Sequence, residues 1–158
     1  MFLVKPLSPT VLLEAVEKQL SLTSEPAAIR PILILAEDDD AARERLARLL
    51  ASDYVVVSVR DGAAVLAQAE QIRPAVVLLD IGMPGMNGFT VARMLRRSMP
   101  NVPILFVTQH AEPVYVGEAF ASGGAGYVLK GRAAAELRPA LREVRTGGRY
   151  ISPGLRSA

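Results

Sequence analysis

Residues 75–88 read AVVLLDIGMPGMNG, an apolar run that ends in an aspartate and is followed by glycines and a proline. A run that is apolar at every position is typical of a strand that is covered on both faces of its sheet. Further short runs rich in apolar and β-branched residues lie at residues 32–36, 54–59, 104–107 and 127–129. The sequence therefore predicts five strands, one of them at residues 75–79.

Stretches with a helical period separate these runs. They occupy residues 41–50, 62–71, 88–98, 113–121 and 133–145. Strands that alternate with helices in this way form parallel sheets whose two faces are both covered by helices. From residue 32 onward we therefore expect an α/β fold, with a doubly wound, five-stranded parallel sheet and helices on both faces.

Residues 1–31 fall outside this alternation. Ser8 and Pro9 are the residue types of a helix N-cap and a first helical position. An apolar stripe follows at Val11, Leu12, Ala15, Val16 and Leu20. We therefore expect an extra N-terminal helix within residues 1–20. Residues 21–31 contain two prolines among serine, threonine and glutamate residues, which is typical of a linker.

The composition describes a chain that can bury a core. Of its 158 residues, 51% are hydrophobic and 22% are charged, which is typical of one globular domain. The absence of cysteine excludes a disulfide framework and a thiolate metal site. The apolar runs are far shorter than the roughly 20 residues that span a bilayer, and Lys5 and Pro6 interrupt the apolar N-terminus. We therefore expect a cytoplasmic protein with no membrane segment.

The formal net charge of +2 conceals a gradient along the chain. Residues 131–158 carry six basic and two acidic residues, whereas the middle of the chain is slightly acidic. Most of the cations are arginines that are spread along predicted helix faces rather than clustered in an arm. This distribution argues against direct contact between this chain and DNA.

Polar residues follow four of the predicted strands. The first strand is followed by the acidic run EDDD at residues 37–40, the third by Asp80, the fourth by Thr108 and the fifth by Lys130. Because parallel strands end at the same edge of a sheet, these groups are expected to converge there. Each of them alone is explained by a helix cap, a turn or a surface charge. Those structural explanations do not predict that acidic residues, a hydroxyl and a lysine occur together at the same edge of the sheet.

Neighbouring carboxylates repel one another unless a cation or a proton intervenes. Oxygen ligands on two adjacent loops, with room for several waters, suit Mg²⁺. One carboxylate is then placed to attack a phosphoryl group, while the metal and Lys130 neutralise the phosphoryl oxygens and Thr108 donates a hydrogen bond. The sheet edge therefore predicts an aspartyl-phosphate site.

Four motifs now carry a specific resemblance. Residues 32–39, 77–88, 103–108 and 126–130 resemble, in order and spacing, the receiver domain of bacterial two-component response regulators. The ending GGRYISP at residues 147–153 is similar to the subfamily whose receivers precede a LuxR-type helix-turn-helix domain. The resemblance implies a flavodoxin-like fold with strand order 2-1-3-4-5. It also implies a signalling phosphoacceptor rather than an enzyme.

The resemblance assigns the phosphoacceptor and the metal ligands. Asp80 takes the phosphoryl group from a sensor histidine kinase or a phosphotransfer domain. Glu37, Asp38, Asp80 and the backbone carbonyl of Gly82 hold Mg²⁺. The receiver would occupy residues 32–148.

The remaining assignments concern the phosphoryl contacts and the switch. Lys130 contacts the acyl phosphate, Thr108 moves to hydrogen-bond it, and the ring of Tyr127 turns inward when Thr108 moves. Asp39 and Asp40 fall outside the metal-binding pair, so we expect them to cap the following helix, with Asp40 as the capping residue.

Two positions, Gln109 and Pro139, depart from the resemblance, whereas His110 occupies a position that resembles a rate-tuning site of the family. Gln109 stands where the family usually has a small residue, and His110 is expected to be a solvated loop side chain. Pro139 lies within the last predicted helix, where it removes a backbone donor, so we expect that helix to kink or to begin effectively at Arg138. The resemblance also implies a homodimer through the fourth helix, fifth strand and fifth helix, and Pro139 weakens that expectation.

Residues beyond the receiver suggest a longer protein. Residues 1–20 resemble the last strand, lysine-proline pair and final helix of another receiver, either as part of a tandem-receiver protein or as a remnant used for packing. Residues 149–158 resemble a tail or the start of a linker. The resemblance therefore implies a receiver upstream and a helix-turn-helix output domain downstream, through which alone DNA would be bound.

Two other functions remain open at this point. A receiver-fold interaction module that switches without phosphorylation would accommodate Gln109 and the N-terminal helix. A phosphatase with an aspartyl nucleophile is disfavoured, because its second acid would stand at the position of Gly82.

Overall fold

The computed structural model describes residues 29–155. The expected N-terminal helix and receiver-like segment within residues 1–20, and most of the expected linker, lie outside the described residues. The assignment of residues 1–31 therefore stays a prediction.

The centre of the molecule is a parallel sheet with strand order β2-β1-β3-β4-β5-β6. The predicted order 2-1-3-4-5 is confirmed, and the predicted number of strands is wrong by one. The strands are β1 (Ile32–Ala36), β2 (Val55–Val59), β3 (Val76–Leu79), β4 (Ile104–Thr108), β5 (Gly126–Leu129) and β6 (Tyr150–Ile151). β6 is too short to show a periodicity of its own, which is why the sequence pattern did not predict it.

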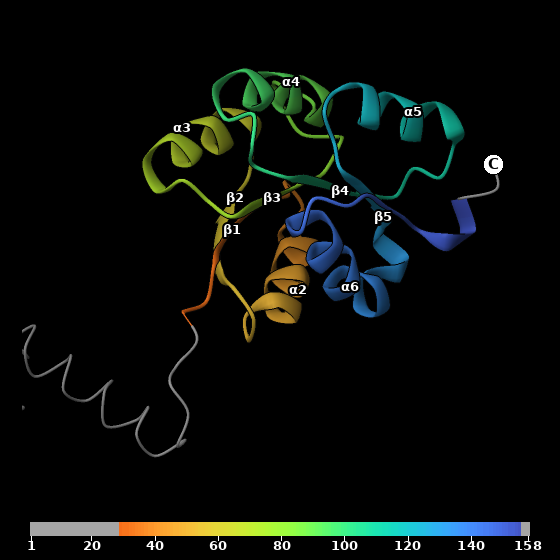
Figure 1. Ribbon diagram of the computed structural model, residues 1–158, viewed down its shortest axis with the longest axis horizontal. Helices are drawn as coiled ribbons and strands as arrows, with labels where there is room; N and C mark the ends of the chain where they lie inside the picture. The colour runs from red at the N-terminus through yellow and green to blue at the C-terminus, as the bar shows by residue number, and fades with distance from the viewer. Residues whose placement is uncertain (1–28, 156–158) are drawn as a thin grey trace, which may run out of the picture.

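Within residues 29–155, five helices cover the sheet, and Figure 1 shows α3, α4 and α5 on one face and α2 and α6 on the other. They are α2 (Asp40–Leu50), α3 (Gly62–Ile72), α4 (Gly88–Ser98), α5 (Pro113–Ala121) and α6 (Ala133–Arg145), with 3-10 turns η1 (Lys130–Arg132) and η2 (Pro153–Leu155). Three predicted helices have the observed bounds, and the other two differ by one residue at one end. This arrangement is the predicted doubly wound fold.

Successive side chains of β3 point to opposite faces of the sheet and contribute to a hydrophobic core on each face. Val77 and Leu79 pack in the core that the sheet forms with α3, α4 and α5. Val76 and Leu78 pack in the core on the side of α2 and α6. All four side chains are fully buried, so the run that is apolar at every position reflects burial on both faces.

Pro139 lies inside α6, which begins at Ala133. The alternative expectation that this helix begins effectively at Arg138 is therefore wrong. Buried residues from both ends of the helix, including Ala133, Leu137 and Val144, anchor it to the sheet. This packing keeps the helix in register across a position that lacks a backbone donor.

Replacing Pro139 with alanine is expected to raise the free energy of unfolding by about 2 kcal/mol, because the helix gains a hydrogen bond that outweighs the added freedom of the unfolded chain. Pro113 is the matched control, since it stands at the start of α5, where a proline costs no helical hydrogen bond. Denaturant unfolding measures both variants. A Pro139→Ala variant no more stable than Pro113→Ala would contradict the expectation.

Candidate functional site

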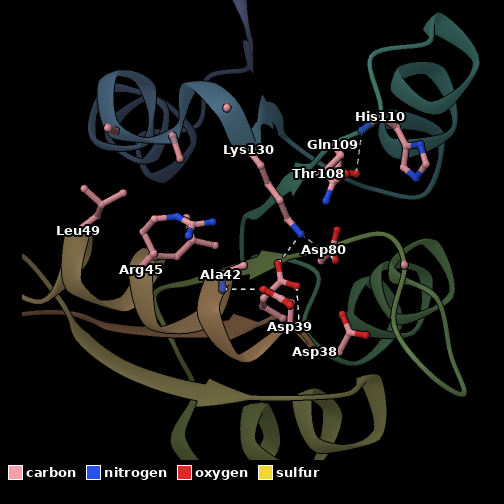
Figure 2. A pocket seen from close by; sticks show the side chains of 16 residues that line it. Asp38, Asp39, Ala42, Arg45, Leu49, Asp80, Thr108, Gln109, His110 and Lys130 are labelled. Carbon is pink, nitrogen blue, oxygen red and sulfur yellow. Dashed lines mark hydrogen bonds and ion pairs between the residues drawn. The ribbon is translucent and has the colours of Figure 1, made fainter.

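The ends of β1, β3, β4 and β5 surround one open cavity of about 920 Å³. Figure 2 labels four of the predicted site residues around it, namely Asp38, Asp80, Thr108 and Lys130. Its lining includes Glu37, Asp38, Asp80, Gly82, Thr108, Gln109, His110 and Lys130. Six of the seven predicted site residues thus lie at this edge, and Tyr127 lies in the interior behind it.

Three carboxylates lie within reach of one cation. Glu37, Asp38 and Asp80 each offer an oxygen, and these oxygens lie within 4.8 Å of one another. The side chain of Glu37 is 1% exposed and that of Asp80 is 10% exposed, whereas Asp38 is exposed. The cluster therefore combines two nearly buried carboxylates with one that faces solvent.

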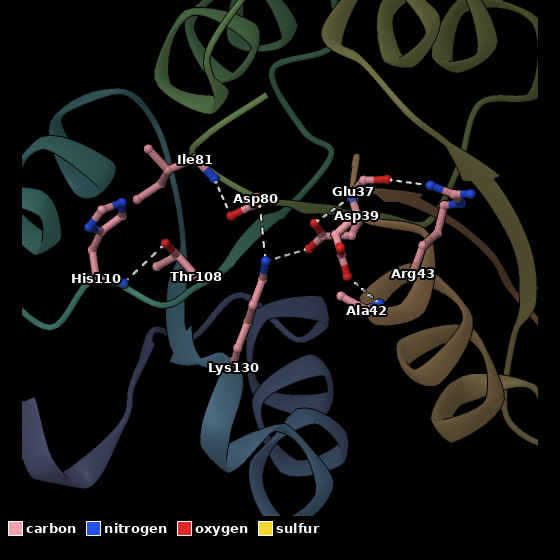
Figure 3. A network of polar contacts seen from close by, with 9 residues as sticks. All are labelled: Glu37, Asp39, Ala42, Arg43, Asp80, Ile81, Thr108, His110 and Lys130. Carbon is pink, nitrogen blue, oxygen red and sulfur yellow. Dashed lines mark hydrogen bonds and ion pairs between the residues drawn. The ribbon is translucent and has the colours of Figure 1, made fainter. Parts of the chain in front are cut away.

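Lys130 bridges the two buried carboxylates, as Figure 3 shows. Its Nζ lies 2.7 Å from Glu37 Oε1 and 3.3 Å from Asp80 Oδ2. The Lys130 side chain is 15% exposed, so water screens these contacts little. The other oxygen of Asp80, Oδ1, accepts a hydrogen bond of 2.8 Å from the backbone N–H of Ile81.

Burial and charge shift two pKa values in the cluster. Burial raises the pKa of Glu37 above its ordinary value, the contact with Lys130 opposes this, and the charge of Asp80 adds to it. Burial alone would lower the pKa of Lys130, but the Glu37 contact and the charge of Asp80 outweigh it and raise that pKa. Lys130 therefore stays charged, and a further cation would stabilise the ionised form of Glu37.

The donor set fits a cation held by oxygen ligands. Glu37 Oε1 is buried, and its polar partner is the ammonium of Lys130 at 2.7 Å. A buried oxygen left in this state has unused capacity for a ligand. Together with Asp38 and Asp80 it offers the hard oxygen atoms that Mg²⁺ and Ca²⁺ bind. The acidic cluster is therefore able to hold a metal ion.

Thr108 and Tyr127 meet at the loop that follows β4. Thr108 is 1% exposed, and its Oγ1 accepts a hydrogen bond of 3.3 Å from the N–H of His110. Tyr127 is fully buried, and its hydroxyl donates to the carbonyl of His110 at 2.8 Å. The ring of Tyr127 thus lies in the inward position, and the backbone of His110 joins the two residues.

His110 is more than the solvated loop side chain that we expected. Its side chain is 41% exposed, but its ring stacks on Tyr115 with centroids 4.1 Å apart and planes 16° apart. The two residues are five positions apart, across the start of α5, so no helical spacing signals the stack. Gln109 is exposed at the rim of the cavity.

The helix cap of α2 differs from the prediction. Asp39 is the N-cap, and its side chain accepts a hydrogen bond of 2.8 Å from the N–H of Ala42. Asp40 is instead the first helical residue, and Arg43 pairs with it at 2.5 Å. The expectation that Asp40 caps the helix is therefore wrong. Arg43 also donates to the carbonyl of Glu37 at 2.9 Å and so holds the start of the acidic run, a role that sequence reasoning missed.

The family model of the response regulator receiver domain matches residues 33–142. The chain belongs to this family. It is 36% identical over 124 residues to the response regulator GacA of Pseudomonas viridiflava, an alignment that covers 77% of this chain and 58% of GacA. The chain therefore spans less than two thirds of that relative.

Two solved structures support the assignment. A LuxR-family two-component response regulator from Aurantimonas sp. SI85-9A1 is 28% identical with a TM-score of 0.77, covering 82% of this chain and 94% of that one. The receiver domain of the putative response regulator NarL from Mycobacterium tuberculosis is 32% identical with a TM-score of 0.72, covering 76% and 99%. The predicted family and fold are confirmed. Within residues 29–155 of this receiver, no helix is long and apolar enough to cross a membrane.

Proposed function

We propose that this receiver accepts a phosphoryl group on Asp80 in a Mg²⁺-dependent reaction and changes conformation as a result. The observation that carries the proposal is the group of three carboxylates within 4.8 Å, with Lys130 against two of them. Lys130, together with a metal ion held by the carboxylates, would neutralise the negative charge of a transferring phosphoryl group. The receiver is then a signalling phosphoacceptor and not an enzyme that acts on other substrates.

The proposed step begins at Asp80. Its Oδ1 accepts a hydrogen bond from the N–H of Ile81, so we assign the attack to Oδ2, which lies on the side of Lys130. Oδ2 forms a bond to phosphorus, the phosphorus–nitrogen bond of a phosphohistidine breaks, and its electron pair returns to the imidazole. When bound, Mg²⁺ would be held by Glu37, Asp38, Asp80 and the carbonyl of Gly82, and it would neutralise phosphoryl oxygens.

We assign the switch to Thr108 and, because the ring of Tyr127 already lies inward, to the bond that joins the Tyr127 hydroxyl to the carbonyl of His110. Thr108 Oγ1 accepts from the N–H of His110, which leaves the hydroxyl hydrogen available to a phosphoryl oxygen. Two or three charge-assisted hydrogen bonds contribute roughly 1.5 to 3 kcal/mol each. Moving a two-state equilibrium from 1:99 to 99:1 takes about 5.5 kcal/mol. The phosphoryl contacts therefore approach the free energy that the change requires.

The partners follow from this chemistry. A sensor histidine kinase or a phosphotransfer domain would supply the phosphohistidine, and the cavity leaves room for it between α2 and the start of α6, beside Arg45 and Leu49. We place the protein in the cytoplasm. We assign any DNA contact to an output domain, as in the DNA-binding members of the LuxR family.

Replacing Asp80 with asparagine is expected to abolish labelling by a small acyl phosphate in the presence of Mg²⁺, since an amide does not supply the attacking oxygen. Asp53→Asn is the matched control, because Asp53 is a half-exposed carboxylate that pairs with Arg138 away from the cavity. Radiolabel incorporation and intact mass measure the reaction.

Equal labelling of the Asp80→Asn and wild-type proteins would overturn the proposal. A wild type that takes no label, and whose thermal midpoint Mg²⁺ does not raise, would also overturn it. That second result would favour an interaction module that switches without phosphorylation.

A further inference from the structure

The last described residues form an additional strand at the edge of the sheet. We call residues 149–155 the C-terminal clasp. Its strand β6 pairs with β5 in parallel, with Gly126 opposite Tyr150 and Tyr127 opposite Ile151. The backbone N–H of Ser152 continues this pairing by donating to the carbonyl of Tyr127 at 2.9 Å. The clasp thus lies against the strand that precedes Lys130.

One buried serine ends the pairing. Ser152 is 0% exposed, and its Oγ accepts a hydrogen bond of 3.1 Å from the N–H of Leu129. The same Oγ donates to Glu136 Oε1 at 2.6 Å, and Glu136 is itself buried on α6. Ser152 therefore substitutes for a backbone acceptor at the end of β5 and satisfies a buried carboxylate.

The neighbouring residues hold the clasp in place. Gly147, with φ 93°, ends α6 in the left-handed region and turns the chain back toward the sheet. The guanidinium of Arg149 lies 4.2 Å from the ring centroid of Phe120 on α5. Tyr150 packs against the core beside α6, and Leu155 packs against the core beside α5. The clasp thus bridges both faces of the sheet.

We propose that Ser152 is a positioning residue that couples the Lys130 end of β5 to the C-terminal clasp. This inference rests on the proposed function. Ser152 forms hydrogen bonds with the backbone of Leu129 and of Tyr127. Leu129 directly precedes Lys130, and Tyr127 is the proposed switch residue. A shift of the Lys130 backbone toward a phosphoryl group would move Leu129 with it, so it would either carry Ser152 along or break its bond, and in both cases the clasp changes.

The proposal bears on the predicted homodimer. β6 lies along β5 on the face formed by α5, β5 and α6, so β6 rather than β5 is the edge strand there. A dimer through this face would contact the clasp. The chain that leaves the receiver after the clasp would then respond to the state of Asp80.

The first test is a double-mutant cycle without any ligand, using Ser152→Ala, Lys130→Ala and the double variant. Denaturant unfolding gives the factor by which each variant changes the unfolding equilibrium constant. The factor for the double variant should differ by at least about threefold from the product of the two single-variant factors. Ser98→Ala, which changes an exposed serine on α4, is the matched control and should combine with Lys130→Ala without coupling. A double variant of Ser152 and Lys130 whose factor equals the product of the two single-variant factors would overturn the proposal.

If Ser152→Ala does not fold, Glu136→Ala takes its place in the cycle, because it removes the acceptor of the Ser152 hydroxyl and keeps the serine. The same two outcomes then decide the question. This arm does not depend on phosphorylation, so its result stands whether or not Asp80 accepts a phosphoryl group.

The second test follows amide hydrogen exchange at Leu129 and Ser152 with beryllium fluoride and Mg²⁺, with fluoride binding monitored by fluorine NMR. The wild type should change its exchange at both amides by at least about threefold, as a shift in local opening would. Bound fluoride with unchanged exchange would overturn the proposal. Failure of fluoride to bind would contradict the proposed function instead, and the double-mutant cycle would still decide the coupling.

Discussion

Replacing Lys130 with alanine is expected to lower the free energy of unfolding by about 3 kcal/mol near neutral pH and to abolish phosphoryl labelling of Asp80. The stability effect has a direct cause, because the variant leaves Glu37 and Asp80 close together, nearly buried and without their cation. Removing one partner of a buried ion pair costs about 3 to 5 kcal/mol. The lower end applies because the Lys130 side chain is 15% exposed.

The loss should depend on pH in a defined direction. Burial raises the pKa of Glu37 above its ordinary value of 4.5, and Lys130 holds it down. Without Lys130 that pKa rises further. A carboxyl group whose pKa is higher in the folded state takes up a proton on folding, so stability increases as pH falls through the folded pKa. The part of the Lys130→Ala deficit that is due to Glu37 is therefore fully present above the folded pKa of Glu37 and is lost as pH falls toward 4.5.

Denaturant unfolding at a series of pH values measures this deficit as the difference from wild type. Arg132→Ala is the matched control. Arg132 is a neighbouring cation whose side chain is 59% exposed, and its Nε lies 3.9 Å from Oε2 of Glu136. The control variant should cost little at any pH. Mg²⁺ should restore part of the stability of Lys130→Ala by supplying a cation to the same carboxylates. A deficit that is independent of pH would contradict the argument.

The core of the fold could be predicted because burial leaves a local signal. β1 has the predicted bounds, and the other four predicted strands differ by one residue at one end. Their side chains on both faces are apolar, as at Val76 and Val77. β6 left no such signal, since two residues show no period, and its place depends on Gly147 and on the bonds of Ser152.

The candidate site likewise has features that the sequence could predict and features that it could not. Glu37, Asp80 and Lys130 could be predicted to converge because strand ends in a parallel sheet share an edge. The stack of His110 on Tyr115 and the bond from Tyr127 to the His110 carbonyl could not, because they depend on the path of one loop. Whether Asp39 or Asp40 caps α2 was likewise decided by the backbone, since both are aspartates and residue type does not distinguish them.

Replacing Gly88 with alanine is expected to lower the free energy of unfolding by about 3 kcal/mol, at the upper end of overpacking effects. A Cβ at Gly88 would lie 2.3 Å from the carbonyl oxygen of Asp80 and 3.0 Å from the Cα of Ile81. These atoms belong to the backbone, so they cannot turn aside as a side chain does. The N–H of Gly88 also donates to the carbonyl of Ile81 at 2.8 Å, and separation of α4 from the strand end would lengthen that bond.

Gly117 is the matched control for this variant. It is an exposed glycine inside α5 with no atom within 4 Å of the position of a Cβ. Gly117→Ala should therefore stabilise the receiver by about 0.5 to 1 kcal/mol, the ordinary gain of alanine over glycine in a helix. Denaturant unfolding of the two variants should give shifts of opposite sign. Equal shifts would show that α4 moves away from Asp80 without cost.

The Gly88 variant also tests how the fold holds the site. Because the new methyl group meets the backbone of Asp80 itself, it displaces the carboxylate relative to Glu37 on the neighbouring strand end. Mg²⁺ should then raise the thermal midpoint of Gly88→Ala less than that of wild type, whereas Gly117→Ala should respond as wild type does. A full Mg²⁺ response in Gly88→Ala would mean that the acidic cluster tolerates movement of Asp80. The close approach of α4 would then serve stability alone.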